Sequence, residues 1–176
     1  MFVMFNPLYG IAALLAVLIF LRRKGKSLSY LVFFSLFWLY LMQVASVAVF
    51  PFPIGIPVEN FKPTINFIPL DFGYCDPRGI EQCLRQIYEN ILLTIPFGFG
   101  INFIARIKPR HFFWLATGVG VVLELVQLSI SLVFRTSFRV VDINDMLLNA
   151  VGILIGYGVF RIFGTVYTHL IQSLKL

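Results

Sequence analysis

Residues 112–134 read FFWLATGVGVVLELVQLSISLVF, an apolar run that is interrupted by a single charged residue, Glu124. A bilayer core about 30 Å thick requires about 20 apolar residues for one helical span, so this run predicts a transmembrane helix. A carboxylate inside such a helix is costly unless other groups stabilise it. The sequence therefore predicts that Glu124 faces partners from other parts of the chain.

The rest of the chain is equally apolar. Of its 176 residues, 59% are hydrophobic and only 12% are charged, and the mean hydropathy is +0.89. A soluble domain cannot cover so much apolar surface. The net charge of +6 raises the question of nucleic-acid binding, but the aromatic residues lie inside the apolar runs and not among Lys and Arg, which argues against it.

We therefore expect an all-α, polytopic membrane bundle of about five transmembrane helices. The expected spans are residues 7–21, extended upstream by 2–5, and residues 28–50, 89–107, 112–134 and 143–163. A proline-rich segment, 51–88, is expected to form an ordered or partly re-entrant loop whose end, 79–88, is an amphipathic helix leading into the third span. Residues 164–176 either continue the fifth helix or lie along the membrane interface.

The charges suggest an orientation and three regions. One side of the membrane receives nine of the 14 basic residues and the other receives five, so the first side is expected to be cytoplasmic, with the N-terminus out and the C-terminus in. Residues 1–58 would hold two helices and a basic turn, 59–163 an external loop and three helices, and 164–176 a helical tail. The nine are Arg22, Arg23, Lys24, Lys26, Arg106, Lys108, Arg110, Arg161 and Lys175.

Both cysteines fall in the loop that this orientation places outside. Cys75 and Cys83 are eight residues apart, and an oxidising compartment would allow a disulfide between them. Two free thiols remain the alternative.

Polar and small residues recur at helical spacing on three of the spans, and each series lies on one stripe of its helix. Such stripes must face protein or water, so we expect the three to pack together. For the glycines, helix packing is the favoured role. The stripes are Asn90, Thr94, Gly98 and Asn102; Gly120, Glu124, Gln127 and Ser131; and Asp142, Asp145, Asn149, Gly152 and Gly156.

The carboxylates and amides of these stripes form the candidate site. Glu124 lies about 18 Å from the cytoplasmic end of its helix, near the midplane, while the other polar groups lie further outward. The sequence thus predicts an outward-facing polar cavity with Glu124 as its floor. Arg135 and Arg139 would stand at its rim, where a guanidinium suits a phosphate or carboxylate headgroup.

Four motifs, taken in order, resemble the VanZ-like family of bacterial membrane proteins. They are Asn66-Phe-Ile-Pro69, Asn90-Ile-Leu-Leu-Thr-Ile-Pro96-Phe-Gly98, Glu124-Leu-Val-Gln127, and residues 139–156 from Arg139 to Gly156. The resemblance implies a bacterial plasma-membrane protein, and the founding member is associated with resistance to the glycopeptide teicoplanin. It adds Asn66 to the binding residues and Pro96 to the packing residues Gly98, Gly120, Gly152 and Gly156.

Three functions fit these residues. The first is a non-enzymatic protein that binds membrane lipids, a lipid-linked wall precursor or a lipid-bearing glycopeptide through Asn66, Asn90, Glu124, Gln127, Arg135, Arg139, Asp142, Asp145 and Asn149. The second is a hydrolase or transferase of lipid phosphates, with Glu124 as acid or base and Asp142 and Asp145 as ligands of a divalent cation. The third is a proton-coupled transporter or flippase that uses Glu124 and functions as a homodimer. We favour the first, with no cofactor.

Overall fold

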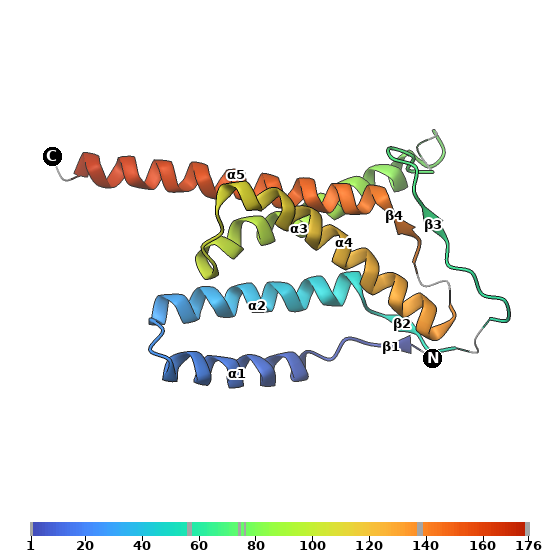
Figure 1. Ribbon diagram of the computed structural model, residues 1–176, viewed down its shortest axis with the longest axis horizontal. Coiled ribbons are helices and arrows are strands. Elements are labelled where there is room, and N and C mark those ends of the chain that lie inside the picture. The colour runs from blue at the N-terminus through green and yellow to red at the C-terminus, as the bar shows by residue number, and fades with distance from the viewer. Residues whose placement is uncertain (1, 56–57, 74, 76, 137–138, 175–176) are drawn as a thin grey trace.

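The computed structural model describes residues 2–55, 58–73, 75, 77–136 and 139–174, so Lys175, one of the nine basic residues above, lies outside it. Among these residues, five helices make up most of the structure (Figure 1); one two-residue strand precedes the first helix and three lie between helices. The helices are α1 (Pro7–Arg23), α2 (Leu28–Ala48), α3 (Ile80–Ile104), α4 (Pro109–Phe134) and α5 (Ile143–Leu174). The strands are β1 (Phe2–Val3), β2 (Phe52–Pro53), β3 (Ile65–Asn66) and β4 (Val141–Asp142).

Among the described residues, the four helices α2 to α5 are long and apolar enough to cross a membrane. The chain is therefore a multi-pass membrane protein. Helix α1 has 17 residues. At about 1.5 Å per residue it is about 26 Å long, slightly shorter than a bilayer core of about 30 Å.

Helix α1 begins later than the apolar pattern suggested. The side chain of Asn6 accepts a hydrogen bond from the backbone N–H of Leu8 at 3.0 Å, and Pro7 occupies the first turn. Both features define a helix start. The expectation that residues 2–5 extend this helix is therefore wrong, and Phe2–Val3 instead pair with Phe52–Pro53 as an antiparallel ribbon.

Two helices are longer than expected. Helix α3 begins at Ile80, so the amphipathic segment and the third span form one continuous helix that ends at Ile104. Helix α5 has 32 residues and runs to Leu174, so residues 164–174 continue the fifth helix. In Figure 1 its last turns project beyond the ends of the other helices.

The helices alternate in direction, with α5 packed against α3 and α4, α2 against α3, and α1 against α2. The basic turns between α1 and α2 and between α3 and α4 lie at one end of the bundle (Figure 1). The described parts of the segment 49–79 and of the α4–α5 connection lie at the other end, together with the first turns of α3 and α5. The candidate site is at this second end.

Helices α3 and α5 run parallel and touch backbone to backbone. A Cβ atom on Gly98 would collide with the carbonyl oxygen of Ile153, and one on Gly156 would collide with that of Ile95. The Thr94 hydroxyl donates to the carbonyl oxygen of Asn149 at 2.9 Å across the same interface. Small residues that allow such close approach, with an interhelical hydrogen bond, are typical of membrane helix packing.

Helix α4 packs antiparallel on α5. A Cβ atom on Gly120 would collide with the carbonyl oxygen of Met146, and Phe112 stacks on Tyr157 with ring centroids 4.0 Å apart. The prediction that the polar stripe of α4 faces protein is confirmed, because all four of its residues are buried. They are Gly120, Glu124, Gln127 and Ser131.

Candidate functional site

The first turn of α5 is capped from two directions. Asp142 precedes the helix, and its Oδ1 accepts a hydrogen bond from the backbone N–H of Asn144 at 2.8 Å, as an N-cap residue does. The backbone N–H of Asp142 donates to Oε2 of Glu124 on α4 at 3.0 Å. In an ordinary capping box, the side chain three residues after the cap would accept that N–H.

That third position is Asp145, and it points to α3 instead. Its Oδ1 accepts hydrogen bonds from Nε2 of Gln86 at 2.9 Å and from Nδ2 of Asn90 at 2.8 Å. Because Glu124 occupies the cap N–H, the Asp145 carboxylate is available to join α5 to the first turns of α3. The site thus links three helices through carboxylates and amides.

The loop before α3 is held to the same place. Strand β3 pairs in parallel with β4, which sets Asn66 opposite Asp142, and Nδ2 of Asn66 donates to both carboxylate oxygens of Asp142 at 3.3 and 3.2 Å. Asn144, which is only 1% exposed, accepts from the backbone N–H of Leu70 at 2.6 Å and donates to the carbonyl oxygens of Ile68 and Asp71. A disulfide between Cys75 and Cys83 ties the end of this loop to the first turn of α3.

Two donors hold the C-terminal end of α2. Nε2 of Gln127 donates to the carbonyl oxygen of Ala48 at 3.2 Å, and Nη2 of Arg139 donates to that of Val47 at 2.8 Å. The last carbonyl groups of a helix have no partner within the helix and carry partial negative charge. A guanidinium and an amide therefore stabilise this end.

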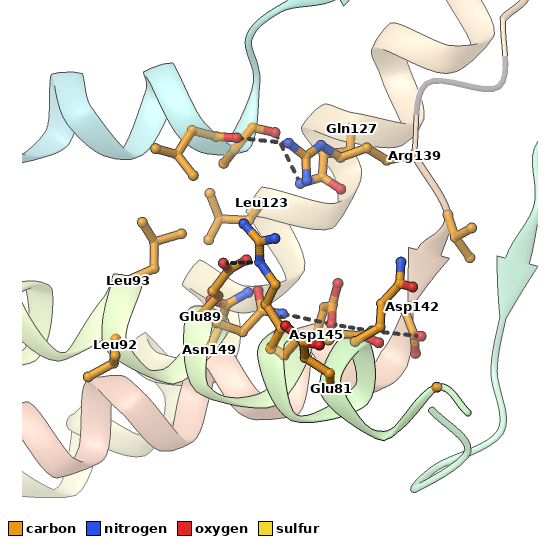
Figure 2. A pocket seen from close by; sticks show the side chains of 18 of the residues that line it. Glu81, Glu89, Leu92, Leu93, Leu123, Gln127, Arg139, Asp142, Asp145 and Asn149 are labelled. Carbon is orange, nitrogen blue, oxygen red and sulfur yellow. Dashed lines mark hydrogen bonds and ion pairs between the residues drawn. The ribbon is translucent and has the colours of Figure 1, made fainter. Parts of the chain in front are cut away.

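Between these two groups of residues lies a cavity of about 1230 Å³. Figure 2 shows Gln127 and Arg139 on the side toward the end of α2, and Glu81, Glu89, Asp142 and Asp145 on the opposite side. The lining comes from α2, α3, α4, α5 and the residues just before α5. Leu92, Leu93 and Leu123 are part of its apolar lining, with Val47, Ala48 and Val140.

Most of the predicted binding residues line this cavity, and three do not. Asn90, Gln127, Arg139, Asp142, Asp145 and Asn149 are on its wall. Asn66 lies behind Asp142, and Arg135 is an exposed residue that ends α4 in a left-handed conformation, with φ 47° and ψ 44°. Glu124, expected as the floor, is 2% exposed and lies behind the wall, where it accepts the N–H of Asp142.

Two residues of this network were not among the candidates from the sequence. Gln86 was read only as part of an amphipathic helix, although it lies one turn before Asn90 on the same face. Asn144 stands between Asp142 and Asp145, off the stripe that the spacing of those residues defines. The position of Asn144, an amide in the first turn of a helix close to a capping Asp, could have indicated that it bonds to backbone groups nearby.

The VanZ/LLP1 family model matches residues 37–164. The chain belongs to the VanZ/LLP1 family. No curated protein and no solved structure matches it. The matched segment contains every residue that lines the cavity, whereas α1 lies outside it.

The mouth of the cavity in this VanZ/LLP1 protein carries charges of both signs. Arg85 and Glu89, one turn apart on α3, form an exposed ion pair at 2.6 Å. Arg78 and Glu81 line the cavity close by. Exposed ion pairs are screened by solvent and add little to stability, so these charges contribute little to holding the fold.

A divalent cation was one of the expectations for Asp142 and Asp145. Both oxygens of Asp142 and Oδ1 of Asp145 accept hydrogen bonds from amide groups. Among the described residues, no group of three or more His, Cys, Asp and Glu side chains is placed to hold a metal ion. The geometry is that of a carboxylate–amide network joining three helices and a loop.

Proposed function

We propose that this VanZ/LLP1 protein is a non-enzymatic binding protein of the bacterial plasma membrane, whose cavity takes the headgroup of an amphiphile such as a lipid-linked wall precursor or a lipid-bearing glycopeptide. The observation that carries this proposal is the cavity of about 1230 Å³. It lies between the C-terminal halves of α2 and α4, the N-terminal half of α3 and the start of α5. Its wall combines carboxylates and amides with guanidinium groups and leucines, as an amphiphile requires.

A second, apolar groove lies along the α2–α3 interface. The groove is about 220 Å³ in volume and is lined by aromatic residues, Pro96 and Gly100, and by Tyr40 at the end nearer the cavity. The Tyr40 hydroxyl donates to the carbonyl oxygen of Leu93, a cavity residue, at 2.6 Å. We assign this groove to an acyl or polyprenyl chain of the same ligand.

We further propose five spans, with the N-terminus outside and the C-terminus inside, so that the cavity opens to the cell exterior. The excess of basic residues at the two short turns supports this orientation. Counting α1 as the fifth span requires only a slight local thinning of the bilayer around it. The resemblance to the teicoplanin-associated founding member makes glycopeptide susceptibility the natural phenotype to examine.

A bulky residue on the α2 wall of the cavity tests the binding proposal. Gln43 is exposed on α2 and lines the cavity, so Gln43→Trp fills part of the space that the headgroup would occupy. Leu39→Trp, one turn away on α2 and outside the linings of both the cavity and the groove, adds similar bulk as a matched control. Binding of a polyprenyl-linked wall precursor to purified protein should weaken about tenfold in the first variant and stay within about twofold in the second.

Teicoplanin susceptibility of cells that express each variant provides the second readout. We expect the Gln43→Trp strain to lose whatever protection the unmodified protein gives, and the Leu39→Trp strain to keep it. Unchanged precursor binding in folded Gln43→Trp protein would refute the proposal.

A further inference from the structure

Two side-chain amides on the cavity wall, those of Gln86 and Asn90, use their NH₂ groups to donate to Asp145. A carboxylate can only accept hydrogen bonds, so Gln86 and Asn90 must present their NH₂ groups to Asp145 and direct their carbonyl oxygens elsewhere. Among the described residues, no donor is bonded to Oε1 of Gln86, to Oδ1 of Asn90 or to Oδ2 of Asp145. The wall is therefore rich in acceptors that lack donors.

A buried oxygen on the same wall also lacks a donor. Asn149 lines the cavity and is 2% exposed, and its Oδ1 has no hydrogen-bond partner among the described residues. Buried polar atoms in folded proteins are nearly always paired, and each exception calls for a physical reason. A donor supplied by a ligand is such a reason.

The carboxylates on this wall favour a positively charged ligand, just as its acceptors favour a ligand that donates hydrogen bonds. Asp142 and Asp145 bring two carboxylates to it, while Arg139 extends to the carbonyl oxygen of Val47 on the far side of the cavity. Figure 2 shows this separation between the carboxylates and the guanidinium. A primary ammonium combines positive charge with three donors, which meets both requirements.

We propose that the cavity recognises a primary ammonium group on the headgroup of its ligand, seated against Asp145, Asn90 and Asn149. This inference rests on the proposed function, because it specifies the ligand class of the same cavity. Two amphiphiles carry this chemistry: a phospholipid with an ethanolamine headgroup, and a lipid-linked wall precursor with a free amine in its peptide. A guanidinium-bearing wall opposite the ammonium suits the phosphate that both contain.

Lipids that differ only in the headgroup test this inference. Purified full-length protein in detergent is mixed with phosphatidylethanolamine, phosphatidylcholine or phosphatidylglycerol of identical acyl chains, and retained lipid is measured by native mass spectrometry. Phosphatidylcholine keeps the positive charge and loses all three donors, so we expect phosphatidylethanolamine to be retained about tenfold better than either of the others. A lipid-linked wall precursor, with its amine free or acetylated, forms the second arm.

Asp145→Asn is the matched substitution, because an amide of the same shape keeps an acceptor for Gln86 and Asn90 and replaces the charged oxygen by a donor. We expect the preference for the ammonium headgroup to fall to within about twofold in this variant. Glu59→Gln removes one carboxylate from an exposed position outside the cavity lining, and it should leave the preference unchanged.

The outcomes separate the two proposals. Equal retention of the three phospholipids, together with equal binding of free and acetylated precursor, would overturn ammonium recognition while leaving amphiphile binding intact. No retention of any lipid by folded protein would refute both. Stabilisation of the lipid-free protein by Mg²⁺ or Ca²⁺ that is lost in Asp145→Asn would overturn the inference in favour of a metal site. The arm with the stronger retention identifies which amphiphile supplies the ammonium.

Discussion

Replacing Glu124 distinguishes a structural acceptor from a site of chemistry, because its carboxylate accepts the backbone N–H of Asp142 at 3.0 Å and does not line the cavity. Glu124→Leu removes the acceptor and leaves a buried N–H without a partner, which costs about 1–3 kcal/mol. The loss of a negative group at the N-terminus of α5 adds about 1 kcal/mol. We therefore expect the free energy of unfolding to fall by about 2–4 kcal/mol.

Glu124→Gln keeps one oxygen acceptor of the same reach, removes the charge and replaces the other oxygen by an NH₂ group. Its expected cost is at most about 1 kcal/mol, since the change also relieves repulsion from Asp142 and Asp145. Unfolding in mixed detergent micelles, followed through the fluorescence of Trp38 and Trp114, measures both variants. Ser129→Leu, on the exposed face of the same helix, controls for added apolar surface.

Ligand binding completes this comparison. A structural acceptor predicts that Glu124→Gln protein binds lipid as the unmodified protein does, because the cavity wall keeps its geometry. Equal destabilisation by Gln and Leu would show that the charge is what matters and would refute the capping role. Loss of binding in a fully stable Gln variant would refute it as well.

Two further substitutions test the packing and the loop. Gly98→Ala should destabilise the protein by about 1–3 kcal/mol in the same unfolding assay, because its Cβ would meet the backbone of Ile153. Gly118→Ala is the control, since Gly118 has open space around it, and this change should be neutral or stabilising. Equal effects would contradict the close approach of α3 and α5. Asn144→Ala removes the hydrogen bonds that hold residues 68–71. Proteolytic cleavage within 59–73 should therefore accelerate at least about tenfold while the helices stay intact. Unchanged cleavage would show that the loop is held by other contacts.

The sequence was sufficient to predict the helices and their buried faces. Apolar run length identifies a membrane helix, and the stripe of Gly120, Glu124, Gln127 and Ser131 could be read from helical spacing alone. Periodicity cannot identify the atom that a buried group bonds. Glu124 reaches Asp142 because α5 starts beside Glu124, about ten residues before the end of α4, and helical spacing does not predict where the next helix starts.

The ends of the helices and the loop contacts were harder to predict for a related reason. The pairing of Asn66 with Asp142 joins residues far apart in the sequence through two-residue strands that carry no repeat. Asn144 gave no signal by spacing, because its role is set by loop carbonyls that fold against it. These contacts depend on tertiary structure, whereas the stripes depend only on the local helix.

The capping arrangement also bears on how the protein is made. Glu124 is synthesised before the N–H that it accepts, and Gln86, Asn90 and Asn66 all precede the two aspartates that they contact. While α5 is still within the ribosome, α4 carries a carboxylate in the membrane that has yet to meet its donor. Final assembly of α3, α4 and the loop therefore awaits insertion of the last helix, and a nascent chain arrested before Val141 is expected to remain bound to the insertion machinery.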